Sequence, residues 1–146
     1  MLNELDVAVL YATDKHPADR DSDRKFGHPV HRGFAERIGA EPIVFDIPNI
    51  SPISGTVIES LVTAIKPDIP EYDIYLMEHT HTVFAAPLIN YLYPESYIVF
   101  LCADHRLFGL SAYRFSNNAL SVIRKTDRMV DKELLSWILN RHVDGI

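Results

Sequence analysis

The sequence predicts an α/β domain of Rossmann type, a three-layer α/β/α arrangement with a mainly parallel sheet. Short apolar, β-branched runs recur along the chain and are not interrupted by alternating polar residues, which is typical of strands covered on both faces. Helical patterns separate these runs, and such alternation favours parallel strands joined by right-handed crossovers. Strands are predicted at 6–12, 42–47, 73–78 and 96–103, and a further strand could begin within 142–146.

The clearest helical pattern lies at 55–67. Thr56 and Glu59 have the spacing of a capping box at its start, and Pro67 stops it. Helical periodicity places the apolar side chains on one face, which we expect to be buried. These side chains are Val57, Ile58, Leu61, Val62 and Ile65.

Three further helices follow from similar signals. The first is predicted at 28–39, with Pro29 in its first turn, Gly39 as its C-terminal cap and apolar residues four apart. A short helix is predicted to begin near Thr82 in spite of the internal Pro87. The last runs from Asp127, as N-cap, to Arg141 and His142. The apolar positions are Val30, Phe34 and Ile38 in the first helix and Val130, Leu134 and Ile138 in the last.

Composition limits the classes of function. The chain has 146 residues, which fits one domain, and 47% of them are hydrophobic, as in a globular protein. A formal charge of −6 without a basic run argues against nucleic acid as a partner. The one cysteine, Cys102, lies in an apolar run, and neither a signal peptide nor a membrane span is evident. We expect a cytoplasmic domain that could still dock on a membrane surface.

Ligands of such sheets bind beyond the carboxyl ends of the strands. The first of these loops, 13–28, carries four aspartates, four basic residues and two histidines, among them His16 as a candidate ligand-binding residue, although such a loop could also be merely solvated. No glycine-rich dinucleotide or P-loop motif is present. The other predicted ligand-binding segments are the turn after Ile47 and the segments 78–82 and 104–108.

Glu78, His79 and His81 follow the third strand. Three interpretations stay open for this cluster. The two histidines could bind a metal if Asp104 and His105 supplied the other ligands. One ring could pack inward and the other face solvent. One ring could also hydrogen-bond a polar ligand, assisted by backbone N–H groups of residues 82–84 at a helix start.

Asp104, His105 and Arg106 follow the next strand. Acids and histidines at two neighbouring strand ends suit acid/base chemistry. Alternatively, Asp104 could cap a turn and Arg106 could pair with it. Four tyrosines are expected to be packing residues near the surface, or to stack on a sugar if they line a cleft. They are Tyr91, Tyr93, Tyr97 and Tyr113.

Three stretches carry a family resemblance. They are HRGFAERIGAEPIVFDI, a helix followed by a strand; YDIYLMEHTHTVFAAPLINYLYPESYIVFLCADH, where a strand ending in histidine precedes one ending in an acid or histidine; and DRMVDKELLSWILNRHVDGI, a helix leading into a strand. Together they resemble the N-terminal, acceptor-side domain of a GT-B fold, family 4-like glycosyltransferase. The resemblance spans most of residues 6–146 and rests on pattern.

The resemblance implies transfer of a sugar from a nucleotide sugar to an acceptor, without metal or cofactor. The acceptor would be held by this domain and the nucleotide-sugar donor by a second domain. By position, His79 and His81 would face the cleft between the domains, and Asp104 or His105 would stand where the family places a histidine that contacts the reacting sugar. The resulting catalytic candidates are Asp104 and His105, and the substrate-binding candidates are His16, His79, His81 and Arg106.

The sequence also departs from the family. The paired glycines that many members have in the first loop are missing, with only Gly27 nearby, and nothing in the 146 residues resembles the nucleotide-binding second domain. We therefore expect these residues to be inactive alone and to expose apolar surface that promotes self-association. Two alternatives remain open: a flavodoxin-like binding or regulatory module, and a small metal-dependent hydrolase using His79, His81 and Asp104.

Overall fold

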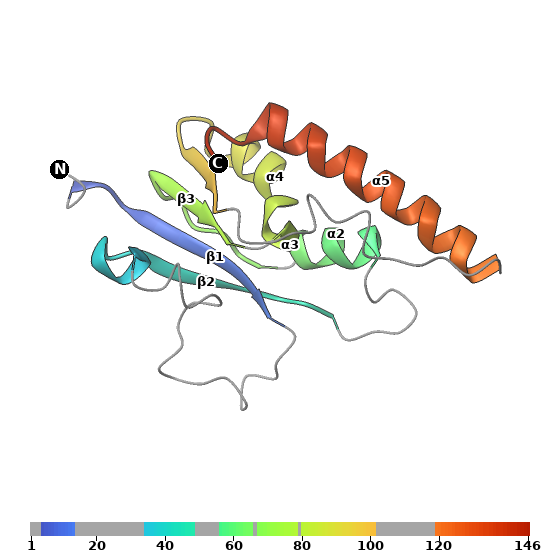
Figure 1. Ribbon diagram of the computed structural model, residues 1–146. Helices are drawn as coiled ribbons and strands as arrows, with labels where there is room; N and C mark the ends of the chain where they lie inside the picture. The colour runs from blue at the N-terminus through green and yellow to red at the C-terminus, as the bar shows by residue number, and fades with distance from the viewer. Residues whose placement is uncertain (1–3, 14–33, 49–55, 66, 79, 102–118) are drawn as a thin grey trace.

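Four parallel strands form one sheet in the computed structural model of the chain (Figure 1). The structure describes residues 4–13, 34–48, 56–65, 67–78, 80–101 and 119–146. The order across the sheet is β2-β1-β3-β4, so the predicted α/β fold with a parallel sheet is confirmed. The strands are β1 (Val7–Thr13), β2 (Glu41–Asp46), β3 (Ile74–Met77) and β4 (Tyr97–Phe100).

The last residues of the chain, where the sequence suggested that a further strand could begin, lie beside β4 but form an isolated bridge and not a strand. Val99 and Gly145 form a parallel bridge, and the Phe100 N–H donates to the Gly145 carbonyl at 2.8 Å. The Asp144 carboxylate accepts from the Ile98 N–H, also at 2.8 Å. The sheet order is thus extended by a fifth segment beyond β4.

The helices are unevenly divided between the two faces of the sheet (Figure 1). Odd and even strand residues point to opposite faces, so Leu10 and Met77 belong to a large core cluster under the helices and Val9 and Leu76 to a smaller one. The helical turn at 34–37 supplies Ala35 to the smaller cluster. The helices over the larger cluster are α2 (Val57–Ile65), α3 (Thr80–Val83), α4 (Ala86–Leu92) and α5 (Ala119–His142).

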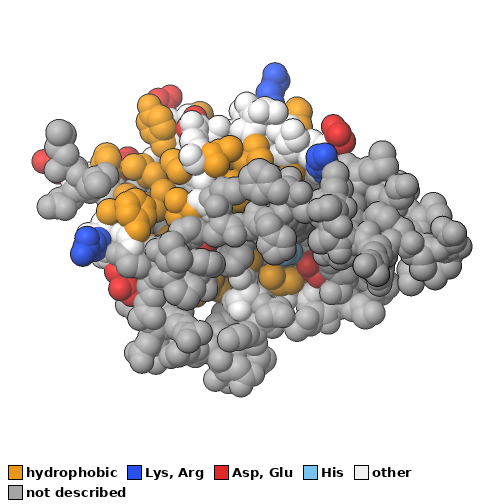
Figure 2. Space-filling model, viewed as in Figure 1, with side chains coloured by type: hydrophobic (Ala, Val, Ile, Leu, Met, Phe, Trp, Pro, Cys, Tyr) orange, Lys and Arg blue, Asp and Glu red, His pale blue; other side chains and the backbone are white. Residues whose placement is uncertain are grey.

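Hydrophobic side chains also reach the surface on the face seen in Figure 2. They gather over the end of the molecule that carries β3, α4 and the C-terminus, and the visible Lys, Arg, Asp and Glu side chains lie around them. Near the smaller cluster, the side chains that remain partly exposed are Ile38, Ile74, Val99 and Leu101. The larger cluster likewise has partly buried hydrophobic side chains packed against it.

Gly39 is the predicted C-terminal cap and is confirmed as one. Its φ is +69°, in the left-handed region, where a residue without Cβ is favoured. The Gly39 N–H donates to the Glu36 carbonyl at 3.2 Å and the Ala40 N–H to the Ala35 carbonyl at 3.0 Å. These two bonds define a Schellman motif, which turns the chain into β2.

Two helix boundaries were predicted wrongly. The last helix begins at Ala119, so Asp127 lies inside α5 and is not its N-cap. Residues 119–126 contain neither Gly nor Pro, and a helix propagates readily through such a segment. The expected helix from Thr82 is two helices, α3 and α4. Pro87 lies in the first turn of α4, where its missing N–H costs no hydrogen bond.

The buried face of α2 also differs from the prediction. Ile58 and Leu61 are exposed, and Ile65 is 70% exposed, whereas the residues buried along the helix are Glu59, Ser60, Thr63 and Ala64. Small side chains allow α2 to approach α3 closely, and the long Glu59 side chain extends toward His81 on α3. The buried face of α2 is therefore its polar, small-residue face and not the predicted apolar one.

Candidate functional site

The candidate site lies where the order of strands reverses. The chain moves from β1 to β2 on one side and then crosses to β3 on the other side of β1. Connections leaving the carboxyl ends of β1 and β3 therefore diverge, which leaves room for a ligand at this edge. Thr13 ends β1, and Glu78 directly follows β3.

Glu78 is an unusual residue for this position because its side chain is buried. The residue is 1% exposed, and neither carboxylate oxygen reaches solvent. Its backbone N–H donates to the Leu10 carbonyl at 2.9 Å, which fixes the chain against β1 just beyond the end of β3. Burying a carboxyl group is costly unless it is paired or hydrogen-bonded, and buried titratable groups near a ligand-binding edge are candidates for a functional site.

A glutamate and a histidine from different helices meet at the same edge. Glu59 Oε1 on α2 lies 3.1 Å from His81 Nε2 on α3. The Glu59 side chain is 8% exposed and the His81 side chain 19%, so the pair is largely shielded while the ring still reaches the surface. Shielding strengthens such a contact, because less water competes for the two groups.

The contact involves one of the two ring nitrogens of His81. Which group donates in the 3.1 Å contact depends on the tautomer of His81, and an ionised carboxylate would accept from a protonated Nε2. In the neutral ring, Nδ1 is then the acceptor. A carboxylate beside an imidazole is a pair of groups found in acid/base sites.

The predicted site residues divide into one that is described and five that are not. His81 lies at the carboxyl edge, which is the end of the sheet where the parallel strands finish, and it contacts Glu59. The other five candidates fall outside the residues that the structure describes: His16, His79, Asp104, His105 and Arg106.

The predicted anion site at the start of a helix was wrong. The helix begins at Thr80, not near Thr82. Thr82 and Val83 are fully buried and Phe84 nearly so, so their backbone N–H groups do not form an exposed anion-binding turn. This follows from the packing of α3 against α2 and the larger core cluster.

Of the four candidate tyrosines, Tyr93 and Tyr97 lie at the opposite edge of the sheet, where the strands begin. Tyr97 begins β4, and Tyr93 follows α4 with its hydroxyl donating to the Ile69 carbonyl at 2.6 Å. Tyr91 and Tyr97 are exposed, and Tyr113 lies outside the described residues. Stacking of the described tyrosines on a ligand at the carboxyl edge is therefore not supported.

Glu59 is the site residue that the sequence analysis missed as a functional group. The sequence pattern indicated that Glu59 is half of a capping box, and its N–H does donate to Thr56 Oγ1 at 3.4 Å. Its carboxylate, however, contacts His81. The sequence signal that could have revealed it is the line of polar residues Glu59, Ser60 and Thr63 along one side of an otherwise apolar helix.

Within the described ranges, no group of three or more His, Cys, Asp or Glu side chains is arranged to hold a metal ion. Nor does any helix in the part of the chain that the structure describes combine the length and apolar character needed to cross a membrane. Comparison of the chain with protein-family models, with curated proteins and with solved structures gave no match.

Proposed function

We propose that this chain is the acceptor-side domain of a cytoplasmic glycosyltransferase that moves a sugar from a nucleotide sugar to an acceptor. The observation that carries the proposal is the acid and histidine arrangement at the carboxyl edge, with buried Glu78 near the β1/β3 switch and the Glu59–His81 pair between α2 and α3. The resemblance in the sequence points to the same domain.

The chemistry of this edge suits a neutral polyhydroxyl ligand. Carboxylates and a neutral imidazole nitrogen accept hydrogen bonds from hydroxyl groups. Asp46 at the end of β2 adds a third acid, after Glu59 and Glu78, to this end of the sheet. Such a set of acids disfavours a phosphate by charge repulsion and leaves the nucleotide of the donor to a second domain.

The proposal predicts that sugars bind weakly and only at the end of the sheet that carries Glu78 and His81. We would titrate the ¹⁵N-labelled chain with methyl glycosides of glucose, galactose, mannose and N-acetylglucosamine and follow the amide resonances. A saturable shift at Glu78 and His81, without a shift at Tyr72 or Tyr97 on the opposite edge, would support acceptor binding. Absence of saturable shifts with every glycoside would contradict it.

Catalysis by these residues alone is not expected. The charge that develops on the leaving nucleotide needs stabilising groups, which the proposal assigns to the second domain. The purified 146 residues, mixed with UDP-glucose or GDP-mannose and the glycosides above, should release no nucleoside diphosphate. Sugar transfer in this mixture would contradict the division of roles between two domains.

A flavodoxin-like binding module is the second candidate, and the strand order favours it. The order β2-β1-β3-β4, with the C-terminal residues beyond β4, is that of flavodoxin-like folds, which bind FMN at the β1/β3 switch. The same titration with FMN separates the candidates. Quenching of flavin fluorescence together with shifts at Glu78 would favour the module, and FMN without effect beside a binding glycoside would favour the glycosyltransferase domain.

A further inference from the structure

We propose that the outer side of α4, together with Trp137 of α5, is the surface through which two copies of this chain form a weak dimer. This surface lies on the side of α4 that faces away from the sheet, so its role does not depend on the ligand of the carboxyl edge. The self-association expected from the sequence thereby acquires a defined surface and a defined partner.

The α4 helix is apolar on its exposed side as well as on its buried side. Ala86 and Ile89 are buried in the larger core cluster. Leu88, Tyr91 and Leu92, which are three and four residues apart, form one exposed stripe on the other side. Tyr91 is 83% exposed. Hydrophobic side chains gather over the end of the molecule that carries α4 (Figure 2).

Trp137 extends this stripe onto α5. Its ring lies edge to face with the His142 ring, with ring centroids 4.9 Å apart. The side-chain nitrogen of Asn90, on α4, lies 2.9 Å from His142 Nδ1 and donates to the His142 carbonyl at 3.1 Å. The end of α5 is thus fixed against α4, while Trp137 stays 48% exposed. The name α4 patch is used below for Leu88, Tyr91, Leu92 and Trp137.

The area of the α4 patch matches what a small dimer interface needs. From their exposed fractions, the four side chains together leave roughly 450 Å² of apolar surface in solvent. A standard interface buries about 800 Å² on each partner, of which about 60% is apolar. The α4 patch therefore has the area of the apolar part of one side of such an interface.

A second copy of the chain is the partner that fits an uncharged apolar surface on an acidic protein. Residues 86–92 contain no Asp, Glu, Lys, Arg or His, so two α4 helices can meet without repulsion between like charges. The formal charge of −6 disfavours anionic lipid headgroups, and α4 lacks the basic residues that hold a helix at a membrane surface. A two-fold axis brings the same patch to both sides of the contact.

The charges beside the α4 patch are complementary to themselves. Glu133 and Arg141 lie four residues before and four residues after Trp137, on the same side of α5, and both are exposed. When two α5 helices run in opposite directions about a two-fold axis, Glu133 of one copy faces Arg141 of the second copy. Exposed charge pairs stabilise little, but they favour this arrangement over a parallel one.

A second exposed stripe, on α2, provides the comparison. Ile58, Leu61 and Ile65 are exposed at helical spacing. All three are aliphatic, whereas tyrosine and tryptophan are the residues enriched in interfaces. The α4 patch is therefore assigned to the dimer, and α2 serves for the control variant.

Sedimentation equilibrium of the purified chain between about 5 and 500 µM tests the proposal, because an interface of this size predicts monomer at the lower end and dimer at the upper end. In the ¹⁵N-labelled chain, the amide resonances of Leu88, Tyr91 and Leu92 should shift over the same range, whereas those of Leu61 and Ile65 should not. At the low micromolar concentration of a denaturation measurement the chain is monomeric, so a substitution at Tyr91 then reports the stability of a single chain.

Tyr91→Glu is the decisive variant. It places two like charges in the contact without removing a buried side chain, so the dissociation constant of the dimer should rise at least about tenfold. Ile65→Glu is the matched control, because Ile65 is 70% exposed and the same charge is introduced on α2. It should change the dissociation constant by less than about twofold. Circular dichroism establishes that both variants are folded.

Three results would overturn the proposal: a monomer over the whole range, association that continues beyond the dimer, and a dimer that Ile65→Glu weakens as much as Tyr91→Glu. A two-fold contact closes at two copies, so larger assemblies would need a different surface. A dimer weakened by Tyr91→Glu alone supports the α4 patch whether or not the chain binds a glycoside.

Discussion

The two edges of the sheet use polar side chains in opposite ways. At the amino edge, which is the end of the sheet where the parallel strands begin, tyrosine and serine hydroxyl groups hydrogen-bond to backbone groups of the connecting segments. At the carboxyl edge, an acid contacts a histidine and a further acid is buried. Neutral side chains satisfied by the backbone serve mainly stability, whereas titratable side chains satisfied by one another remain able to exchange protons. The hydrogen bonds of the amino edge therefore indicate a structural role, and the chemistry of the proposed function would lie at the carboxyl edge.

Tyr75 is the centre of the amino edge. Its ring is fully buried and has the largest volume among the fully buried side chains. Its hydroxyl donates to the Pro70 carbonyl at 2.5 Å and accepts from the Tyr72 N–H at 2.9 Å. Tyr93 stacks on it with ring centroids 6.3 Å apart, and Ser96 Oγ donates to the Tyr72 carbonyl at 2.6 Å. The network ties the segment before β3 to the turn before β4.

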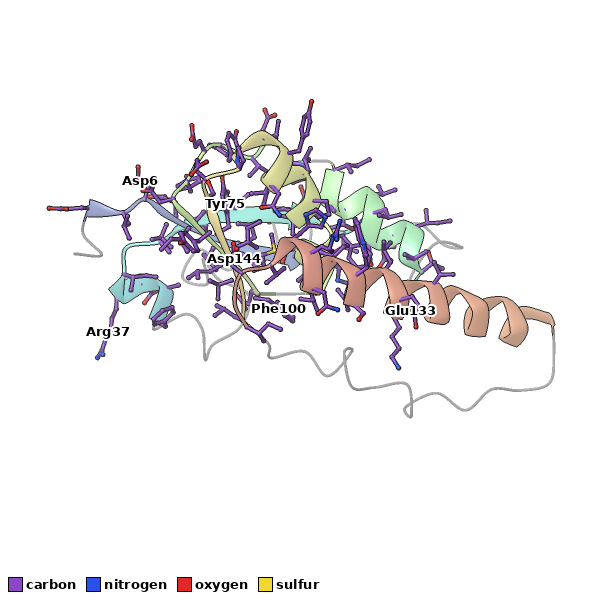
Figure 3. All side chains as sticks on the ribbon, turned by 90° about the horizontal axis from the view of Figure 1, so that it is seen from above. Asp6, Arg37, Tyr75, Phe100, Glu133 and Asp144 are labelled. Carbon is purple, nitrogen blue, oxygen red and sulfur yellow. The ribbon has the colours of Figure 1, made fainter. Side chains whose placement is uncertain are left out.

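Figure 3 places this edge in the molecule. Asp6 and Tyr75 lie toward the same end of the sheet, whereas Glu133 lies away from them along α5. The Asp6 N–H donates to the Asp73 carboxylate at 2.8 Å, so β1 and β3 are also joined at this end. Variants at Glu133 can therefore serve as controls for variants at the amino edge.

The largest effect is expected from Tyr75→Ala. Removing the ring leaves a cavity and strips the Pro70 and Tyr72 backbone groups of their partner, so the free energy of unfolding should fall by about 3–5 kcal/mol. Urea denaturation followed by circular dichroism measures it. Tyr91→Ala, at a highly exposed position on α4, is the control and should cost about 0.5 kcal/mol or less. An equal effect of the two substitutions would contradict the stabilising role of the amino edge.

A smaller loss is expected from Tyr75→Phe, which keeps the ring and removes only the hydroxyl. The Pro70 carbonyl and the Tyr72 N–H then lose one hydrogen bond each, and both are partly buried. We expect a loss of about 1–2 kcal/mol in the free energy of unfolding. Tyr91→Phe should change it by less than about 0.5 kcal/mol. No difference between the two variants would show that water replaces the hydroxyl without cost.

The third prediction concerns alkaline pH. Burial raises the pKa of Tyr75 from its ordinary value of 10.0 to about 12. The unfolded chain therefore loses the phenolic proton first, so the contribution of Tyr75 is complete below pH 10 and disappears as the pH rises toward about 12. Between pH 10 and about pH 10.5 only a small part of this stability is lost. The fall in the free energy of unfolding over this range should therefore be smaller than the fall caused by Tyr75→Phe. Urea midpoints of the wild type should fall with pH more steeply than those of Tyr75→Phe, and parallel curves would contradict the assignment.

The strands could be predicted from the sequence because local pattern decides them. β1 and β2 each occupy an apolar, β-branched run, and their observed bounds differ from the predicted ones by one residue at each end. Gly39 could be predicted for the same reason, since a left-handed C-terminal cap depends on the residue itself. Local sequence pattern was therefore enough to predict the strands of the sheet and the helix cap at Gly39.

The site could be predicted only in part because it depends on contacts between distant residues. Periodicity showed that α2 has an apolar face, but α3 and the sheet determined that the face with Glu59 turned inward. Glu59 and His81 are 22 residues apart in the sequence, and no local spacing links them. His81 was predicted because it follows a strand, which is a topological signal, whereas Glu59 carries none.

The smallest change in stability is expected from Glu59→Gln, and it tests the comparison most directly. Glutamine has nearly the volume of glutamate and can still hydrogen-bond His81, so the free energy of unfolding should fall by about 1 kcal/mol or less. Urea denaturation beside Glu133→Gln measures the difference. A loss as large as that of Tyr75→Ala would make the carboxyl edge as structural as the amino edge, and the Glu59–His81 pair would then be a packing contact. A small loss would instead separate the two edges, because the same substitution would change the Glu59–His81 contact while leaving the fold nearly as stable as before.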